Sequence, residues 1–335
     1  MKLALLKYDY NFPTYNIGDY IQSLAAKQYL QDEVILVDRE GLKDYEGEDI
    51  KLIMNGWFLH NLKQWPPSDK IHPLFISFHL SPHAKVLLDD YKNVQYFKKF
   101  EPIGCRDFYT MEILKKKGIK PYFSGCLTLT LGQKYLRENV RNEILFVNVI
   151  PKMLDWNMLR AKFINICING EILNMIRFIY HLKNNIGKIW TRNKIIEDLF
   201  SKDILSVKQD LIHDLNRKDT NDQRFLKADI LLKRYSKARI VFTSKIHCAL
   251  PCLAIGTPVV FIKGPDLNNE FDTSRFDGLL DYINVIEINS QNKISCNYSN
   301  KFQKIDSFFI PPTNKDIRTL VENLNFYVKE FIHFQ

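Results

Sequence analysis

Lys245 and His247 lie where a predicted strand meets a predicted helix. Residues 239–243 form a short run rich in β-branched and aromatic side chains, which is typical of a buried strand. A compact apolar helix runs from there to Ile255. Ligands bind at the carboxyl ends of parallel strands, and helix N-termini attract anions through their free N–H groups. The sequence thus predicts an anion site here, with a buried core histidine as the alternative interpretation of His247.

The segment around this site predicts a β-α-β unit. Ser244 is the expected helix N-cap, and Gly256 ends the helix. Residues 259–262 then form a second apolar strand. Such units build parallel sheets with right-handed crossovers. Pro251 lacks the N–H that would bond the carbonyl of His247, so we expect an irregular first turn.

The start of the chain has a similar strand–loop–helix pattern. A strand is predicted over 2–8 and a helix over 20–30, with Asn16, Gly18 and Asp19 between them. In one interpretation, Asn16 and Asp19 cap the helix and Gly18 relieves a tight turn. In the other, the loop binds an anion or a sugar.

Asn55 and Trp57 follow the predicted strand 52–54. The carboxyl ends of parallel strands lie at one edge of a sheet, so both residues should lie near Asp19. Trp57 either stacks on a sugar face or only packs in the core.

Arg106 and Asp107 follow a segment, 94–103, that we predict to be a strand. A helix is predicted over 108–117. At the start of this helix the two side chains can pair with each other, which is a structural role. An arginine here can also clamp an anionic ligand across a cleft.

Three more cations stand near predicted element ends. Arg224 lies near the start of a helix predicted over 223–235, and Lys263 lies at the carboxyl end of the second apolar strand. Arg275 belongs to a loop-rich stretch, 264–280. Each is either a ligand for an anion or an ordinary surface charge.

The composition is that of a globular protein of about two domains. The 335 residues are 46% apolar and 25% charged, with a net charge of +9. This charge predicts anionic partners or only a solvated basic surface. It is spread along the chain, without the basic stripe or recognised module of a nucleic-acid-binding protein.

The sequence also bears on location and metal binding. The N-terminal apolar run is too short for a signal peptide, and no apolar stretch approaches the roughly 20 residues that span a bilayer. Six cysteines are scattered, as buried reduced thiols are. Cys248 and Cys252 lack a second pair that would complete a zinc site. We expect a cytoplasmic protein without a metal.

The predicted order of strands and helices is typical of an α/β protein. Polar residues 132–143 mark a domain boundary. We expect a first domain over 1–135, a second over 142–314 and a C-terminal helix over 315–335. Further helices are predicted over 158–163, 172–184 and 195–200, and a further strand over 186–191.

Four motifs in chain order resemble those of the polysaccharide pyruvyl transferase family. They are Asn16-Ile17-Gly18-Asp19, Asn55-Gly56-Trp57-Phe58, Gly104-Cys105-Arg106-Asp107 and Ser244-Lys245-Ile246-His247, the last followed by Ala249, Pro251, Gly256 and Pro258-Val259-Val260. The last motif is similar to the family's S-R-[LI]-H…G-x-P-V-V segment. Lys245 stands where the family usually has arginine, so a point charge replaces a bidentate fork.

The resemblance implies a glycosyltransferase-B-like fold. Two doubly wound Rossmann-like α/β domains would face a cleft, and the C-terminal helix would return to the first domain. The resemblance also implies transfer of a pyruvyl group from phosphoenolpyruvate to a sugar, forming a ketal. The sugar would belong to a cell-surface polysaccharide or its lipid-linked precursor.

This chemistry assigns roles to the candidate residues. His247 would be the general acid, with a pKa raised beside an anion pocket, and Asp19 or Asp107 would be the base. The donor-binding residues would be Lys245, Ser244, Arg224, Lys263, Arg275 and Arg106. The acceptor-binding residues would be Asn16, Gly18, Asn55 and Trp57.

The implied partners are phosphoenolpyruvate as co-substrate and a saccharide acceptor, for example one linked to polyprenyl diphosphate. No cofactor and no nucleic acid are expected. Peripheral contact with the inner face of an anionic membrane is expected. Two alternatives stay open because family membership does not determine chemistry. One is a glycosyltransferase of the same fold with a nucleotide-sugar donor, for capsule or exopolysaccharide synthesis. The other is a non-catalytic binding protein of a polysaccharide locus.

Overall fold

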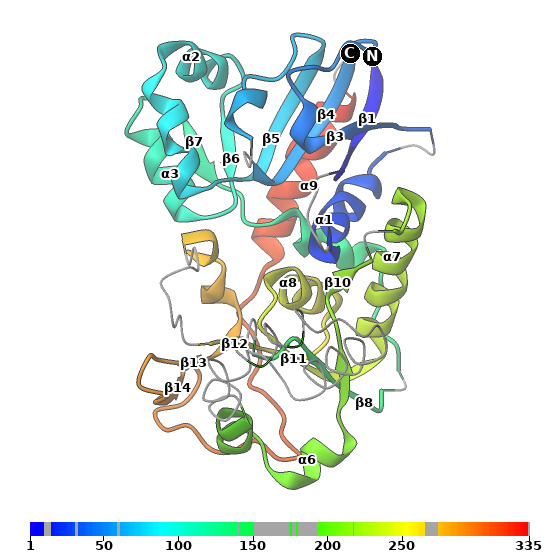
Figure 1. The fold of residues 1–335 in the computed structure, drawn as a ribbon, viewed down its shortest axis with the longest axis vertical. Helices are drawn as coiled ribbons and strands as arrows, with labels where there is room; N and C mark the ends of the chain where they lie inside the picture. Colours follow the sequence, from blue (N-terminus) through cyan, green and yellow to red (C-terminus); the bar gives the residue numbers. More distant parts are fainter. Residues whose placement is uncertain are drawn as a thin grey trace.

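The structure is a computed structural model. It describes residues 1–9, 15–30, 33–58, 61–139, 141–150, 175, 179, 193–216, 218–264 and 274–333. The helices predicted over 158–163 and 172–184 and the strand over 186–191 lie outside these residues, apart from positions 175 and 179. Two six-stranded sheets lie one above the other in Figure 1, with α8 between them.

The first sheet is parallel throughout. Its strand order is β3-β1-β4-β5-β6-β7. The strands are β1 (Lys2–Lys7), β3 (Ile35–Asp38), β4 (Ile50–Phe58), β5 (Ile71–Leu80), β6 (Ile103–Cys105) and β7 (Pro121–Phe123). The helices of this half are α1 (Ile17–Lys27), α2 (Tyr91–Lys99) and α3 (Phe108–Lys115).

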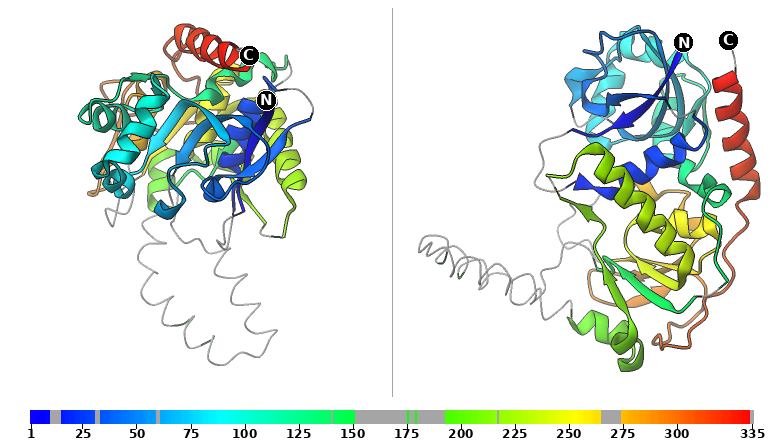
Figure 2. Two further views of the ribbon diagram at one scale, coloured as in Figure 1. Left: turned by 90° about the horizontal axis from the view of Figure 1, so that it is seen from above. Right: turned by 90° about the vertical axis from the view of Figure 1, so that its right-hand side faces the viewer.

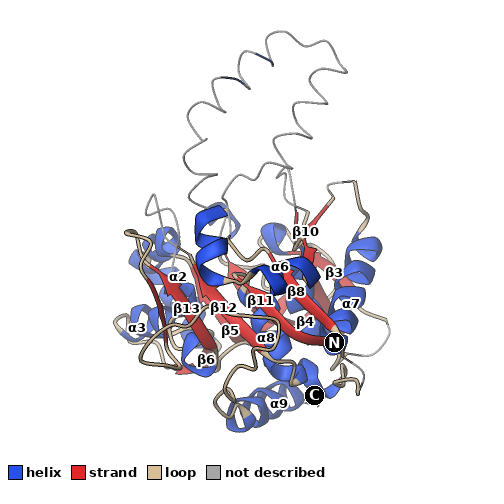
Figure 3. Ribbon diagram, turned by 90° about the horizontal axis from the view of Figure 1, so that it is seen from below, coloured by secondary structure: helices blue, strands red, loops and turns tan. Residues whose placement is uncertain are grey.

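The second sheet is parallel except at one edge, where β13 and β14 are antiparallel. Its order is β14-β13-β12-β11-β8-β9, and the middle strands lie side by side in Figure 3. The strands are β8 (Glu143–Val147), β9 (Gln209–Leu211), β11 (Ala238–Thr243), β12 (Val259–Lys263), β13 (Asn284–Ile288) and β14 (Ile294–Cys296). The helices are α6 (Lys202–Val207), α7 (Asn221–Lys237) and α8 (Ile246–Ile255), and residues 193–199 are also helical, near the predicted 195–200.

These two sheets confirm the predicted α/β class with Rossmann-like halves. The predicted β-α-β unit is also confirmed, as β11, α8 and β12, with parallel pairing between the two strands. Gly256 caps α8 with a φ of 80°, which a residue with a side chain rarely adopts.

Three local predictions are wrong. Segment 94–103 is not a strand, because Asp90 caps a helix that buries Val94 and Phe97 on one face, and β6 begins only at Ile103. β4 does not end at 54 but continues to Phe58, through an irregular register. The N-cap of α8 is Lys245, not Ser244.

Two connections join the halves. β10 (Asp214–Leu215) from the second half pairs antiparallel with β2 (Tyr15–Asn16), just before α1. The C-terminal helix α9 (Arg318–His333) lies along the first half (Figure 2). Lys51 Nζ donates to the carbonyl of Phe331 at 2.9 Å, and the largest apolar cluster continues from the first sheet into α7, α8 and α9. These contacts hold α1 against α8.

Candidate active site

The N-termini of α1 and α8 meet at Gly18 and His247. A Cβ atom at Gly18 would lie 3.1 Å from both Cβ and Nδ1 of His247, which is tighter than an ordinary contact. Gly18 is not among the glycines with positive φ, so its predicted role in a tight turn is wrong. Its lack of a side chain instead lets the histidine approach. Asn16 does cap α1, because its Oδ1 accepts the Gly18 N–H at 3.0 Å.

His247 is buried with one nitrogen unsatisfied. Its side chain is 8% exposed, and Nε2 has no hydrogen-bond partner among the described residues. Burial lowers its pKa well below the usual value, and the nearby basic groups Arg106, His213 and Arg275 lower it further. The predicted raised pKa is therefore wrong for the protein without a bound anion. A neutral imidazole surrounded by cations is suited to receive an anion.

The start of α8 is tied to the end of β8. Ser244 Oγ donates to the carbonyl of Asn148, and the Lys245 N–H donates to Thr243 Oγ1 at 3.0 Å. The Ser244 hydroxyl thus serves to position the helix. The half-buried Lys245 side chain lies near enough to His213 for its charge to lower the pKa of that ring.

Three of the predicted donor-binding cations have different partners in the structure. Arg224 Nη1 donates to the Tyr20 hydroxyl at 3.0 Å and to the Tyr8 carbonyl at 3.2 Å, so it joins α7 to the first half. Lys263 forms an ion pair with Glu287 on the next strand at 2.7 Å. Arg275, on the short helix Ser274–Phe276, is near enough for its charge to lower the pKa of His247.

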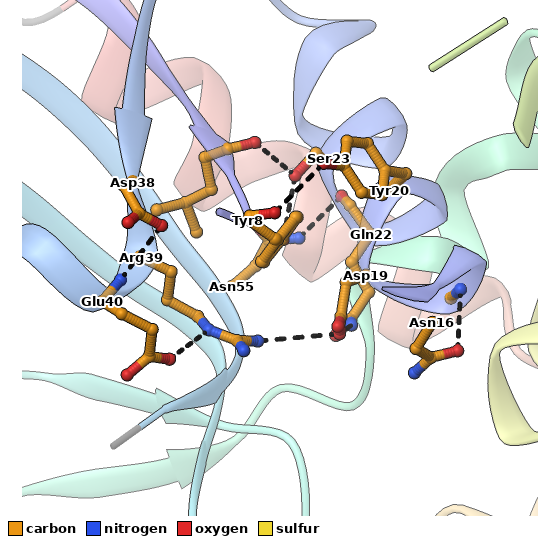
Figure 4. A network of polar contacts seen from close by, with 12 residues as sticks. Tyr8, Asn16, Asp19, Tyr20, Gln22, Ser23, Asp38, Arg39, Glu40 and Asn55 are labelled. Atoms are coloured by element: carbon orange, nitrogen blue, oxygen red, sulfur yellow. Dashed lines mark hydrogen bonds and ion pairs between the residues drawn. The ribbon is translucent and has the colours of Figure 1, made fainter. Parts of the chain in front are cut away.

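Asp19 lies in a polar network of the first half (Figure 4). Its Oδ1 is 3.6 Å from Arg39 Nη1 and accepts from Gln22 Nε2 at 3.3 Å. Asn55 Nδ2 donates to the Gln22 carbonyl at 2.9 Å. The Asn55 Oδ1 atom is buried without a hydrogen-bond partner in the described part of the chain. Arg39 also lies 5.9 Å from the Trp57 ring, so β4, β3 and α1 meet here.

Asp107 pairs mainly with His79. Its Oδ2 is 2.6 Å from His79 Nδ1, whereas Arg106 Nε is 3.9 Å away. The other carboxylate oxygen accepts from the Thr110 N–H at 2.8 Å and so caps α3. Arg106 is 1% exposed, and its Nη1 reaches Gln22 Oε1 at 3.5 Å. Asp107 thus pairs with His79 and caps α3, and Arg106 lies between it and the Asp19 network.

Sequence reasoning missed Arg39, His79 and His213 as members of this site. Arg39 directly follows β3 and His79 lies near the end of β5, and their position at the carboxyl ends of apolar strands is the signal that could have identified them. His213 had no such signal, because the short strands around it carry no clear pattern.

Metal and membrane features can be described for the same part of the chain. Among the described residues, no group of three or more His, Cys, Asp or Glu side chains could hold a metal ion. The helices seen in those residues include none with the length and apolar character to cross a bilayer.

The fold and site define an α/β protein whose cations and buried histidine gather between two helix N-termini. The family model for polysaccharide pyruvyl transferase matches residues 16–264, and the chain belongs to this family. It is therefore a polysaccharide pyruvyl transferase in the general sense, with a saccharide acceptor. No curated protein matches the chain. It is similar to a functionally uncharacterised Klebsiella pneumoniae protein of known structure, with 13% identity over 82% of this chain and 86% of that chain, and a TM-score of 0.41.

Proposed function

We propose that this protein transfers the pyruvyl group of phosphoenolpyruvate to two hydroxyls of one saccharide residue, forming a ketal. The observation that carries the proposal is the Nε2 of His247, which is buried without a partner among the described residues and lies within reach of the charges of Arg106 and Arg275, with Lys245 acting on the adjacent His213. Unsatisfied buried nitrogen atoms and nearby cations favour an anionic ligand.

Phosphoenolpyruvate has two anionic groups, a phosphate and a carboxylate. Lys245 and the N–H groups at the start of α8 would bind one of them, and Arg106 with Arg275 the other. The entering negative charge would raise the pKa of His247, which then acquires a proton. The neutral ring would thus become an acid only when the donor is bound.

The reaction balances with this single acid. His247 gives its proton to the methylene carbon of the donor, which becomes a methyl group and leaves an oxocarbenium-like C2. One acceptor hydroxyl bonds to C2 and loses its proton, the phosphate leaves, and a second hydroxyl closes the ketal. Of the two hydroxyl protons, one restores His247 and the other leaves with phosphate. Asp19 is better placed than Asp107 as the base, because Asp107 is fully buried against His79.

The remaining assignments extend this proposal. The protein would have two Rossmann-like domains in a glycosyltransferase-B-like arrangement. Residues 1–135 and the C-terminal helix would bind the acceptor, and residues 142–314 would bind the donor. Asn16, Asn55 and Trp57 would contact the acceptor of a capsule or exopolysaccharide pathway. The reaction would occur in the cytoplasm, near the membrane if the acceptor is lipid-linked. It would need neither cofactor nor metal.

A donor panel tests the proposal. Phosphoenolpyruvate and nucleotide sugars would each be added at increasing concentration, and the melting temperature followed. A ligand at 100 times its dissociation constant stabilises a protein by about 2.7 kcal/mol. We expect stabilisation by phosphoenolpyruvate that persists in EDTA. Stabilisation by a nucleotide sugar alone would instead support a glycosyltransferase.

A further inference from the structure

His213 is a buried histidine whose ring nitrogens lack a well-formed hydrogen bond within the described part of the chain. It lies between β9 and β10, its side chain is 1% exposed, and both ring nitrogens are unsatisfied within the described residues. A neutral imidazole has one donor and one acceptor, and each is costly to bury unpaired. Such a ring is well suited to pair with a ligand.

The backbone of His213 is fastened to the start of α8. Its N–H donates to Asn148 Oδ1 at 2.7 Å, and the Asn148 carbonyl accepts from Ser244 Oγ. Asn148 has a φ of 46°, which is unusual for a residue with a side chain. One residue thus positions both His213 and the N-terminus of α8.

One cation, Lys245, acts on the ring. Burial first and then the charge of Lys245 lower the pKa of His213 to about 3, while contact with the backbone of His247 acts in the opposite direction. The carbonyl of His247 has no helical donor, because residue 251 is proline. The basic groups that act on His247 are Arg106, Arg275 and His79 besides His213 itself. A ligand that pairs with these basic groups would be an anion.

We propose that His213 binds the anionic donor together with His247 and Lys245. This inference rests on the proposed function for the identity of the donor, but not for its charge. Binding would convert His213 from a neutral, unpaired ring into a protonated one that donates to phosphate or carboxylate oxygen. Two imidazoles and one ammonium group would then contact the same ligand.

His213 also connects the donor to the other half of the chain. It directly precedes β10, whose Asp214 pairs with Asn16, the N-cap of α1. Gly18 in the same cap touches His247. An anion on His213 and His247 therefore holds both helix N-termini in place, beside the predicted acceptor residues.

The test uses His213→Gln and His213→Leu, with the exposed His333→Gln as control. Dissociation constants for phosphoenolpyruvate and for inorganic phosphate are measured by calorimetry, and melting temperatures without anion. We expect at least about tenfold weaker binding for both His213 variants. His213→Leu should melt no lower than wild type, because it removes an unpaired buried polar group. A structural role would instead lower the melting temperature.

The outcomes separate this inference from the proposed function. If wild type binds phosphate in a His213-dependent way but phosphoenolpyruvate no better, the donor is wrong and the inference stands. Unchanged affinity in a folded His213 variant overturns the inference and leaves the proposed function intact. A wild-type protein that binds neither anion also overturns the inference. If both variants misfold, proton uptake by wild type decides. Calorimetry in buffers of different ionisation enthalpy should show uptake of more than one proton with phosphoenolpyruvate, and one or fewer contradicts a role for two imidazoles.

Discussion

Gly18 and His247 touch where the two halves of the chain meet, at a distance of 3.1 Å from a would-be Cβ to the ring. The first belongs to α1 and the second to α8, so the glycine positions the proposed acid across the junction. A side chain in this place must displace the imidazole or separate the helices. Gly18→Ala should therefore destabilise the fold by about 1–3 kcal/mol and weaken donor binding.

Gly41→Ala is the matched control for this change. A Cβ at Gly41 would lie 3.8 Å from Asp38, which is an ordinary contact. Urea unfolding and donor titration of both variants compare the two sites. Equal stability of Gly18→Ala and Gly41→Ala would contradict the close approach.

Lys245 should contribute donor affinity through charge. Lys245→Ala removes the ammonium group whose charge acts on His213, so phosphoenolpyruvate should bind more weakly. Lys245→Arg should bind as well as wild type or better, because a guanidinium group can form two parallel bonds to phosphate or carboxylate. Calorimetric titration of the two variants measures this, and an unchanged dissociation constant for Lys245→Ala would remove this residue from the site.

His247→Asn should separate chemistry from binding. Loss of the general acid should lower the rate by roughly a hundred- to ten-thousand-fold, with a much smaller change in donor affinity. In deuterium oxide, wild type should place deuterium in the ketal methyl group, because the proton comes from an exchangeable acid. Near-normal turnover by a folded His247→Asn protein on its acceptor would exclude this residue as the acid.

The two buried histidines should make stability depend on pH. The folded pKa of His213, about 3, and that of His247 both lie below the unfolded value near 6.5. The unfolded chain then binds more protons than the folded chain below pH 6.5. The free energy of unfolding should therefore decrease as the pH is lowered through that range. The slope is at most about 1.4 kcal/mol per pH unit for each ring. At higher pH both rings are neutral in either state and contribute nothing to the slope.

Unfolding curves between pH 4 and pH 8 would measure this effect. His213→Leu should have a smaller slope below pH 6.5, whereas His333→Gln should keep the wild-type slope because its side chain is exposed. Added phosphate should reduce the loss of stability in wild type, since an anion stabilises the protonated rings. A slope that does not change in His213→Leu would contradict the buried, neutral state of this ring.

Local patterns in the sequence determined much of the fold. Apolar runs and Gly256 predicted the β11–α8–β12 unit, because strand and helix periods and turn residues are encoded by neighbours in the chain. The same reasoning identified Asn16 as a helix cap. Segment 94–103 was predicted wrongly, since its apolar content fits either a short strand or one face of a helix. In the structure this stretch begins as a helix, which buries Val94 and Phe97 on one face.

Only the tertiary structure decided which polar groups meet. Asp107 pairs with His79 from another strand rather than mainly with its neighbour Arg106, and Asp19 pairs with Arg39. The close contact of Gly18 with His247 spans more than two hundred positions in the chain, and no local pattern encodes it. The charge state of His247 was also beyond the sequence, because a pKa depends on burial and on charges brought near by folding. Chain neighbours determine the elements, whereas the site arises from contacts between elements that are distant in sequence.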